Sequence, residues 1–368
     1  MKHCDKKAVT VNVTNKCNLR CVYCMASSGM EQQNPMIIDK DFAFAGIKDS
    51  IEGKPTGIRA TVLRFFSPGE PTQCIDLMRE CVAFAKSLKP SIQVELQTNG
   101  IFETREDTNW IADNCDIVWF SIDGPAYVND RYRPDAFGKG STSRAEENMK
   151  IVMAKTNVGV RSTVDLPMFD KQTEMVQYYY NLGVKNLAFN PITTPVKRGD
   201  NSQKDINKDD PMLFAKGFVK AYELAKKLGI DLTNSMTFNF DEETVCGCRS
   251  CVPMPQLNPD GSVSSCDLAL YSDVKSELQC FIYGQWDKSS KKIKYDIEKA
   301  KFLANRTLVN LPHCRDCEVG EYCAGGCAGR VAFQTGDIYG VIPSICEAIK
   351  YMAKYSDLGA RKIKFTHP

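Results

Sequence analysis

Residues 14–29 read TNKCNLRCVYCMASSG, and this stretch decides how the rest of the chain is interpreted. Its three cysteines, Cys17, Cys21 and Cys24, have the spacing C-x3-C-x2-C and follow a β-branched run that predicts a strand. A closed tetrahedral metal site takes four protein ligands. Three neighbouring thiols therefore indicate a metal group that keeps one coordination position open.

The overall composition is that of an ordinary globular protein. The 368 residues are 43% hydrophobic and 25% charged, with a formal net charge of +2, so we expect no binding to nucleic acid. The apolar run near the N-terminus is too short for a signal peptide, and no run approaches the roughly 18 residues that span a bilayer. We therefore expect a cytoplasmic protein without a membrane partner. The 17 cysteines, an odd number, cannot all pair as disulfides.

The first 230 residues alternate predicted strands with predicted helices. We expect strands at 8–14, 60–66, 92–98, 116–122, 158–164 and 184–190. We expect helices at 39–52, 72–88, 104–113, 141–155, 170–182 and 211–228. This order predicts the α/β class, with a parallel sheet covered by helices. Because eight units close a full barrel, six indicate either a partial barrel or an open doubly wound sheet.

Polar or glycine-bearing loops follow the first four predicted strands. After the cysteine loop come SPGEPT (67–72), QTNG (97–100) and SIDGP (121–125). The carboxyl ends of parallel strands share one rim, where α/β folds place their chemistry. We therefore expect these loops to surround a single site.

The composition and the pattern of the sequence change near residue 235. Ten of the 17 cysteines lie beyond this point, in a segment poor in strand–helix repeats. We expect two domains, a barrel at 1–235 and a small cysteine-rich domain at 236–368.

The C-terminal cysteines suit two groups of four if Cys327 crosses from one group to the other. The first group is then Cys251, Cys266 and Cys327 with either Cys246 or Cys248, of which we prefer Cys246. The second group comprises Cys314, Cys317, Cys323 and Cys346. Zinc ribbons usually use two matched pairs, whereas iron–sulfur clusters use irregular runs in which one cysteine can serve another cluster. Iron–sulfur clusters are therefore favoured over zinc.

Taken together, these motifs resemble the radical S-adenosylmethionine (SAM) superfamily, and the C-terminal cysteines resemble its SPASM branch. In length and in the Cys266–Asp267 step, the chain is similar to anaerobic sulfatase-maturating enzymes and related SPASM peptide maturases. The resemblance covers nearly the whole chain and implies a partial (β/α)6 TIM-like barrel followed by a SPASM domain. It implies three 4Fe–4S clusters, one for SAM on Cys17, Cys21 and Cys24, and two auxiliary clusters. It also implies SAM and an external one-electron reductant of the flavodoxin or ferredoxin type.

The same resemblance marks residues that would line the SAM site. They are Tyr23, Glu70, Gln97, Asn99, Ser121, Asp123 and Arg133. Glu70 belongs to a motif that meets the methionyl amino group, and Arg133 is a candidate for binding the carboxylate. Pro68 stands where the family has glycine, and Asn129 where it has histidine. Ordinary structural roles remain open for Tyr23 in packing, Ser121 in a turn and Arg133 in a surface ion pair.

Asp267 follows the proposed ligand Cys266 directly. In sulfatase-maturating enzymes an aspartate at this place is proposed to take a proton as a Ser or Cys side chain is oxidised. The resemblance implies the same catalytic role for Asp267, provided its carboxylate reaches the reacting group. The alternative is that Asp267 caps a turn beside the cluster.

Three functions remain open from the sequence. The first is the abstraction of a hydrogen atom to oxidise a peptide or protein side chain, as SPASM relatives do. The second is the dehydrogenation or epimerisation of a small molecule, such as an amino sugar or aminocyclitol. Because the first predicted strand begins near residue 8, we expect no preceding peptide-recognition domain, which keeps the second function open. The third is a non-catalytic iron–sulfur or zinc protein, which would leave the open position without a use.

Overall fold

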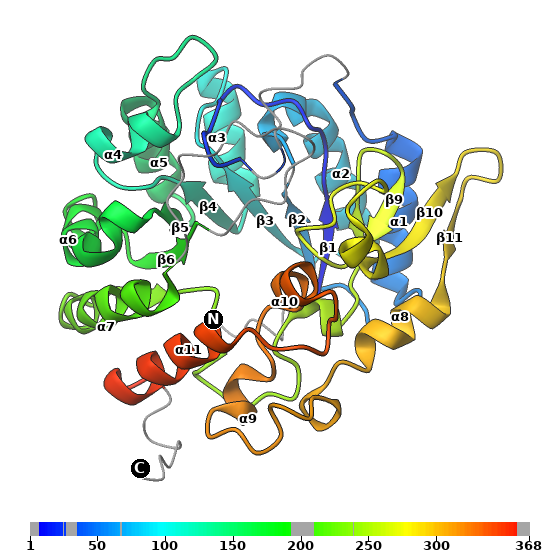
Figure 1. Cartoon of the computed structure of the whole chain (residues 1–368). Helices are drawn as coiled ribbons and strands as arrows, with labels where there is room; N and C mark the ends of the chain where they lie inside the picture. Colours follow the sequence, from blue (N-terminus) through cyan, green and yellow to red (C-terminus); the bar gives the residue numbers. More distant parts are fainter. Residues whose placement is uncertain are drawn as a thin grey trace.

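A computed structural model describes residues 7–24, 26, 35–66, 68–192, 210–237 and 239–358. These residues form one sheet whose strand order is β11-β10-β9-β8-β1-β2-β3-β4-β5-β6-β7 (Figure 1). The strands are β1 (Ala8–Val11), β2 (Val62–Phe65), β3 (Gln93–Thr98), β4 (Ile117–Ser121), β5 (Asn157–Val164), β6 (Asn186–Pro191), β7 (Asp231–Thr233), β8 (Gln256–Leu257), β9 (Ser262–Ser264), β10 (Ile282–Asp287) and β11 (Lys292–Tyr295).

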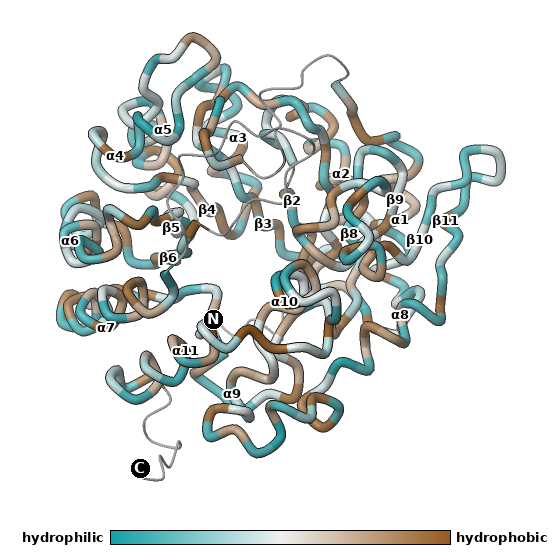
Figure 2. The backbone as a smooth tube through the Cα atoms, viewed as in Figure 1, coloured by the Kyte–Doolittle hydropathy of each residue, from teal (hydrophilic) through white to brown (hydrophobic). Residues whose placement is uncertain are grey.

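Helices lie over the outer face of the barrel strands and also within the cysteine-rich region (Figure 1). They are α1 (Lys40–Glu52), α2 (Ile75–Leu88), α3 (Arg105–Asn114), α4 (Ala126–Tyr132), α5 (Thr142–Met153), α6 (Gln172–Asn181), α7 (Pro211–Lys227), α8 (Ile297–Ala304), α9 (Gly320–Cys323), α10 (Ala328–Thr335) and α11 (Pro343–Tyr355). Figure 2 shows hydrophobic residues along the strands and polar residues on the outer surfaces of the helices. None of the described helices is both long and apolar enough to cross a bilayer.

The predicted α/β class is confirmed, and all six predicted strands are present. Strands β1 to β7 pair in parallel and follow one another in sequence order. A doubly wound sheet reverses its order at a switch point, so the unreversed order selects the partial barrel. The parallel strands are buried because the helices cover one face and the barrel interior covers the other.

Helix starts follow ordinary capping chemistry. The side chain of Asp39 accepts a hydrogen bond from the Phe42 amide at the start of α1. Thr104 does the same for Asp107 at the start of α3, and Asp210 for Leu213 at the start of α7. These caps place each helix directly after its loop, so the strand ends stay free for the site.

The sequence predicted neither α4, nor β7, nor any strand or helix that follows β7. The loop after β4 contains α4, and the cysteine-rich region contains β8 to β11. Strand β8 pairs in parallel with β1, and Asn12 donates a 2.7 Å hydrogen bond to Asn258 across this pair. The expected boundary between 235 and 236 therefore divides the sequence but does not interrupt the sheet. Helix α11 also packs against α7 of the barrel (Figure 1).

Candidate active site and auxiliary cysteine centres

The first three cysteines form a compact loop between β1 and the rim of the barrel. The backbone amides of Arg20 and Val22 donate to carbonyls of Pro134 and Tyr132, which fixes the loop against the segment after α4. Burial, then Glu70, raises the pKa of Cys17 to about 12. Burial also raises the pKa of Cys21, and the neighbouring Cys24 and Cys17 add to this effect. The three thiols thus lie within electrostatic reach of one another.

The loop after β2 is tied directly to the cysteine loop. The amides of Gly69 and Glu70 donate to the carbonyls of Thr14 (3.1 Å) and Lys16 (2.7 Å). A side chain at position 69 would place its Cβ 2.1 Å from the Lys16 oxygen, so only glycine allows this approach. Pro68, which departs from the family pattern, therefore precedes a backbone that is still positioned by Gly69.

Glu70 is buried, with 2% of its surface exposed. Its carboxylate accepts hydrogen bonds from the amide and hydroxyl of Thr72, the hydroxyl of Thr98 and the amide of Asn99. Burial raises the pKa of Glu70, while these donors oppose the rise. The carboxylate therefore holds the loops after β2 and β3 together beside Cys17.

Asn99 joins the loop after β3 to the cysteine loop. Its side-chain amide donates to Asn18 at 2.7 Å and lies 3.8 Å from the sulfur of Cys17. Gln97 and Ser121 are half-buried on β3 and β4, and neither side chain has a hydrogen-bond partner within the described residues. Their polar groups therefore remain available to a ligand.

Asp123 and Arg133 form a buried ion pair rather than a surface one. Arg133 donates two hydrogen bonds to Asp123, at 2.8 Å through Nε and 3.1 Å through Nη2. The hydroxyl of Tyr23 also donates to Asp123, and the guanidinium lies 5.3 Å from the Tyr23 ring centre. The backbone amide of Thr163 on β5 donates a further hydrogen bond to the carboxylate of Asp123. All three predicted residues thus meet beside Cys21, and Arg133 already has a carboxylate partner.

Asn129, which stands in place of the family's histidine, has a clear structural contact. Its side chain accepts from the Asp123 amide at 2.9 Å and donates to the hydroxyls of Ser141 and Thr142. Asn129 therefore fixes the loop that carries Asp123.

Asp267 lies over the barrel interior, where β8, β1 and β2 are adjacent. Arg64 on β2 and Gln256 on β8 both donate to its Oδ1, each at 2.7 Å. Burial alone would raise the pKa of Asp267, but Arg64, Arg249 and Arg161 together lower it to about 2. The side chain is 36% exposed and lines a cavity, and its Oδ2 has no partner in the described parts of the chain.

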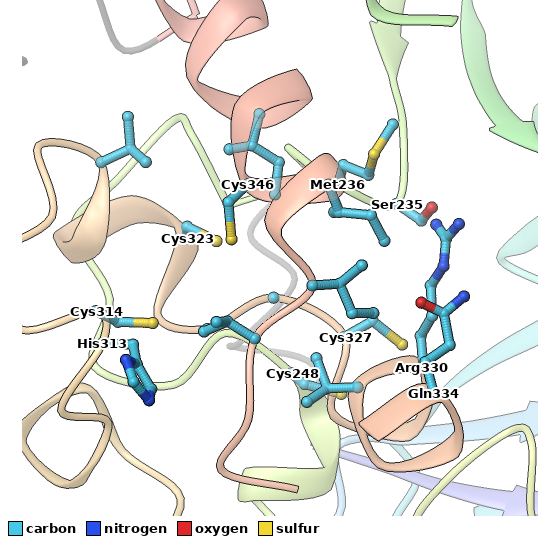
Figure 3. A pocket seen from close by; sticks show the side chains of 18 of the residues that line it. Ser235, Met236, Cys248, His313, Cys314, Cys323, Cys327, Arg330, Gln334 and Cys346 are labelled. Atoms are coloured by element: carbon cyan, nitrogen blue, oxygen red, sulfur yellow. The ribbon is translucent and has the colours of Figure 1, made fainter. Parts of the chain in front are cut away.

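That cavity measures about 510 Å³ and is lined mainly by the cysteine-rich region (Figure 3). Seven cysteines line it: Cys248, Cys266, Cys314, Cys317, Cys323, Cys327 and Cys346. Most of the other lining side chains are apolar, among them Val319, Val331 and Ile349. The two predicted C-terminal groups therefore share one cavity.

Within this cavity the thiols divide into two gatherings. Burial, then Cys314, Cys346 and Cys317, raises the pKa of Cys323 to about 12. Figure 3 shows Cys314, Cys323 and Cys346 on one side and Cys248 with Cys327 on the other.

The second gathering contains Cys266, Cys327 and Cys248. Burial raises the pKa of Cys266, followed by the effects of Cys327 and Cys248. Cys251 instead forms a side-chain hydrogen bond with Cys246, and neither of these two cysteines lines the cavity. Our preference for Cys246 over Cys248 as the ligand therefore lacks support from this geometry, which places Cys248 beside Cys266 and Cys327.

Comparison with known proteins identifies the first region. Residues 11–177 match the sequence model of the radical SAM superfamily. This chain carries a radical SAM domain. The expected resemblance to the radical SAM superfamily is thereby confirmed, and a 4Fe–4S cluster and SAM follow from the family.

Beyond this domain, the chain is similar to a cysteine-type anaerobic sulfatase-maturating enzyme of Clostridium novyi. The two are 22% identical over 338 residues, which cover 85% of each protein. The structure of native anSMEcpe with bound AdoMet and Kp18Cys peptide superposes with a TM-score of 0.73 at 16% identity, covering 95% of this chain and 96% of that one. Streptococcus suis SuiB bound to its precursor peptide SuiA gives a TM-score of 0.63 at 14% identity, over 92% and 75% of the two chains. At these structural identities the likeness concerns the fold, and it extends through the cysteine-rich region.

The donor chemistry of the radical SAM domain and of the cavity fits iron–sulfur groups, because every gathered ligand candidate is a thiol. Within the described ranges, no three His, Cys, Asp or Glu side chains meet closely enough to hold one metal ion.

Sequence reasoning missed the arginines around Asp267. Arg64 and Arg161 come from β2 and β5, and Arg249 donates to the carbonyl of Ala8 and the hydroxyl of Thr10 on β1. A signal was present, because Arg64 and Arg161 are single charged residues within otherwise apolar predicted strands. A charge in a strand that is covered on both faces needs a partner inside the fold.

Proposed function

We propose that this chain is a radical SAM oxidoreductase that abstracts a hydrogen atom to oxidise a peptide or protein side chain. The observation that carries the proposal is the convergence at one rim. The three thiols after β1 lie beside the Glu70–Asn99 contact and the Asp123–Arg133 pair, each at the carboxyl end of its strand. This is where a (β/α) barrel places its reaction.

We assign the SAM cluster to Cys17, Cys21 and Cys24, within a radical SAM core at 1–235. With its cluster and SAM bound, the site supplies a 5′-deoxyadenosyl radical. Gln97 and Ser121 offer unpartnered polar groups to SAM. Glu70 and Asn99 keep the surrounding loops in register, and the buried Asp123–Arg133 pair presents a fixed charge pattern next to Tyr23.

The region 236–368 is assigned two auxiliary 4Fe–4S clusters. The ligands assigned to one cluster are Cys314, Cys317, Cys323 and Cys346, and those assigned to the other are Cys251, Cys266 and Cys327 with either Cys246 or Cys248. An external reductant of the flavodoxin or ferredoxin type provides the electron that starts the reaction.

Asp267 is the residue proposed to accept a proton from the substrate. Arg64 and Gln256 hold one carboxylate oxygen, which fixes the orientation and leaves Oδ2 for a substrate hydroxyl, thiol or amine. With a pKa of about 2 the carboxylate is ionised at neutral pH but is a weak base.

The peptide substrate class rests on the relatives. The anSMEcpe structure contains a peptide, and SuiB is bound to a precursor peptide, and both share this fold across more than nine-tenths of the chain. A carbon radical beside a hydroxyl or thiol, next to a proton acceptor and an auxiliary cluster, suits a two-electron oxidation.

The test is anaerobic incubation with SAM, a strong reductant and peptides containing Ser or Cys. Mass spectrometry follows 5′-deoxyadenosine and a peptide product that is lighter by two hydrogens. Asp267→Asn should still cleave SAM but form about 10²–10⁴-fold less product, the usual span for general acid–base catalysis. Asp273→Asn, an aspartate of the same region, serves as the matched control.

Equal product from wild type and Asp267→Asn would remove Asp267 from the mechanism. A peptide that stays unmodified, while an amino sugar or aminocyclitol is consumed, would replace the proposed substrate class.

A further inference from the structure

Arg306 follows α8 in the cysteine-rich region and is the largest of the fully buried side chains. Only 1% of its surface is exposed. Burying a guanidinium removes its hydration, so the charge needs compensation inside the protein.

The hydrogen bonds that Arg306 makes to the backbone do not supply that compensation. Its Nε donates to the carbonyl of Ile338, Nη2 donates to Gly325 at 2.8 Å, and Nη1 donates to Gly326 at 3.4 Å. Each of these acceptors is a neutral backbone carbonyl. Among the described residues no Asp or Glu forms an ion pair with Arg306. The hydrogen bonds are satisfied, but the positive charge has no carboxylate beside it.

The two glycines that Arg306 holds lie in the crossing segment, residues 324–326, between Cys323 and Cys327. Ala324, Gly325 and Gly326 have φ values of 41°, 79° and 58°, three consecutive residues in the left-handed region. Such a run turns the chain sharply and favours glycine. A side chain at position 325 would place its Cβ 3.0 Å from Nη2 of Arg306. The guanidinium therefore clamps the segment that leads from one cysteine gathering to the other.

Arg306 also lies close to cysteines of both gatherings. The carbonyls of Gly325 and Gly326, which accept from its guanidinium, stand in the chain between Cys323 of one gathering and Cys327 of the other. Cys251 accepts a hydrogen bond from the same side chain. One buried cation thus stands between two sets of thiols.

We propose that Arg306 is the shared counter-charge of the two auxiliary clusters and makes both easier to reduce. The inference rests on the proposed function, which assigns iron–sulfur clusters to these cysteines. Net charge, hydrogen bonds and burial set the reduction potential of such clusters. A buried cation stabilises the form that has gained an electron, because low dielectric preserves the attraction.

The role fits the electron balance of the proposed oxidation. The proposed oxidation removes one hydrogen atom, one proton and one electron from the substrate; Asp267 would accept the proton, and a cluster held by Cys266 and Cys327 would be placed to accept the electron. The two-electron oxidation is complete only if that last electron has an acceptor near Cys266. Arg306 is a positioning residue for this acceptor and does not contact the substrate.

The experiment compares reduction potentials in the reconstituted full chain. Arg306→Gln removes the charge but keeps hydrogen-bond donors, whereas Arg306→Lys keeps the charge. Arg315→Gln is the matched control, because Arg315 is exposed and lies in the same region. Redox titration by EPR reads the clusters, and a background lacking Cys17, Cys21 and Cys24 isolates the auxiliary signals.

At the wild-type midpoint, we expect the ratio of reduced to oxidised auxiliary cluster to fall at least tenfold in Arg306→Gln, a 59 mV shift for a one-electron couple. The ratio should change by less than about threefold in Arg306→Lys and less than about twofold in Arg315→Gln, since solvent screens the exposed charge. Equal potentials in wild type and Arg306→Gln, with full iron in both, would overturn the proposal and leave the proposed function intact.

Iron content separates the remaining outcomes. If Arg306→Gln loses auxiliary iron while Arg306→Lys retains it at a near wild-type potential, the charge itself is required and the proposal stands. If both variants lose the iron, Arg306 serves only to fold the crossing segment and the proposal fails. If the background without Cys17, Cys21 and Cys24 holds no iron at all, the auxiliary clusters and this inference fail together.

Discussion

The rim of the barrel and the C-terminal cavity both gather thiols, but they treat charge differently. At the rim, Arg133 is bound to Asp123 through two hydrogen bonds before any ligand arrives. Beside the cavity, Arg306 donates to backbone carbonyls and to Cys251, and no carboxylate among the described residues pairs with it. The charge of Arg133 is thus balanced by Asp123, whereas Arg306 has no carboxylate partner among the described residues, and we propose the auxiliary clusters as its counter-charge. The two regions therefore differ in whether a carboxylate of the protein balances the charge of their buried arginine.

The largest test of this comparison removes the rim thiols. Replacing Cys17, Cys21 and Cys24 together by Ala should abolish 5′-deoxyadenosine formation and lower the iron content by about four atoms per chain. Anaerobic reconstitution followed by iron analysis and SAM cleavage assays measures both. Cys81→Ala, at a buried cysteine outside both regions, should change neither. Retained SAM cleavage in the triple variant would contradict the assignment of the SAM cluster to Cys17, Cys21 and Cys24.

The next test concerns the cavity and asks which cysteine completes the group of Cys266 and Cys327. Cys248 lines the cavity beside them, whereas Cys246 is hydrogen-bonded to Cys251 and does not line the cavity. Cys248→Ala should therefore lower the iron content by up to about four atoms, while Cys246→Ala should retain it. Iron content and the near-ultraviolet spectrum of the reconstituted variants decide the matter. The reverse result would restore Cys246 as the ligand.

A smaller effect is expected from breaking the paired charges at the rim. Asp123→Asn leaves the guanidinium of Arg133 buried without its carboxylate, which should cost about 3–5 kcal/mol of unfolding free energy. The matched control is Asp113→Asn, whose pair with Lys155 has both side chains about half exposed. That variant should lose less than about 1 kcal/mol. Urea denaturation of the cluster-free proteins measures the difference, and equal losses would contradict the buried pair.

The last test concerns a buried cysteine that belongs to neither region. Burial raises the pKa of Cys115 from 9.0 to about 12. The folded state therefore keeps its proton where the unfolded state has lost it, so stability falls as pH rises from 9 toward 12. Between these values, wild type should lose about 1.4 kcal/mol per pH unit more than Cys115→Ala. Parallel pH profiles of the unfolding free energy in the two proteins would show that burial does not raise this pKa.

Strands β1 to β6 were predictable because most of them are short runs rich in β-branched and aromatic residues that are largely buried. Strand β1, Ala8–Val11, illustrates this, because all of its residues are buried and the strand has no exposed face. Strands β8 and β9 have two and three residues, too few for any period to be visible. Their place is set instead by pairing with β1, which is distant in sequence.

The candidate site divides in the same way. Local spacing was enough to find the cysteine groups and the rim loops. The contacts of Arg64 with Asp267 and of Arg306 with Gly325 join residues that are 203 and 19 positions apart. No local rule links such residues, and only the unusual presence of Arg64 in an apolar strand hinted at a buried partner.

The pairing of β8 with β1 has a consequence for the growing polypeptide. Thr10 and Asn12 donate backbone hydrogen bonds to Pro255 and Leu257, so the outer edge of the first strand is covered by residues made about 250 positions later. At typical synthesis rates of about 5–20 residues per second, that edge waits roughly 12–50 s on the ribosome. An uncovered apolar edge strand is a template for aggregation. The nascent barrel is thus a natural client for chaperones until its cysteine-rich region emerges.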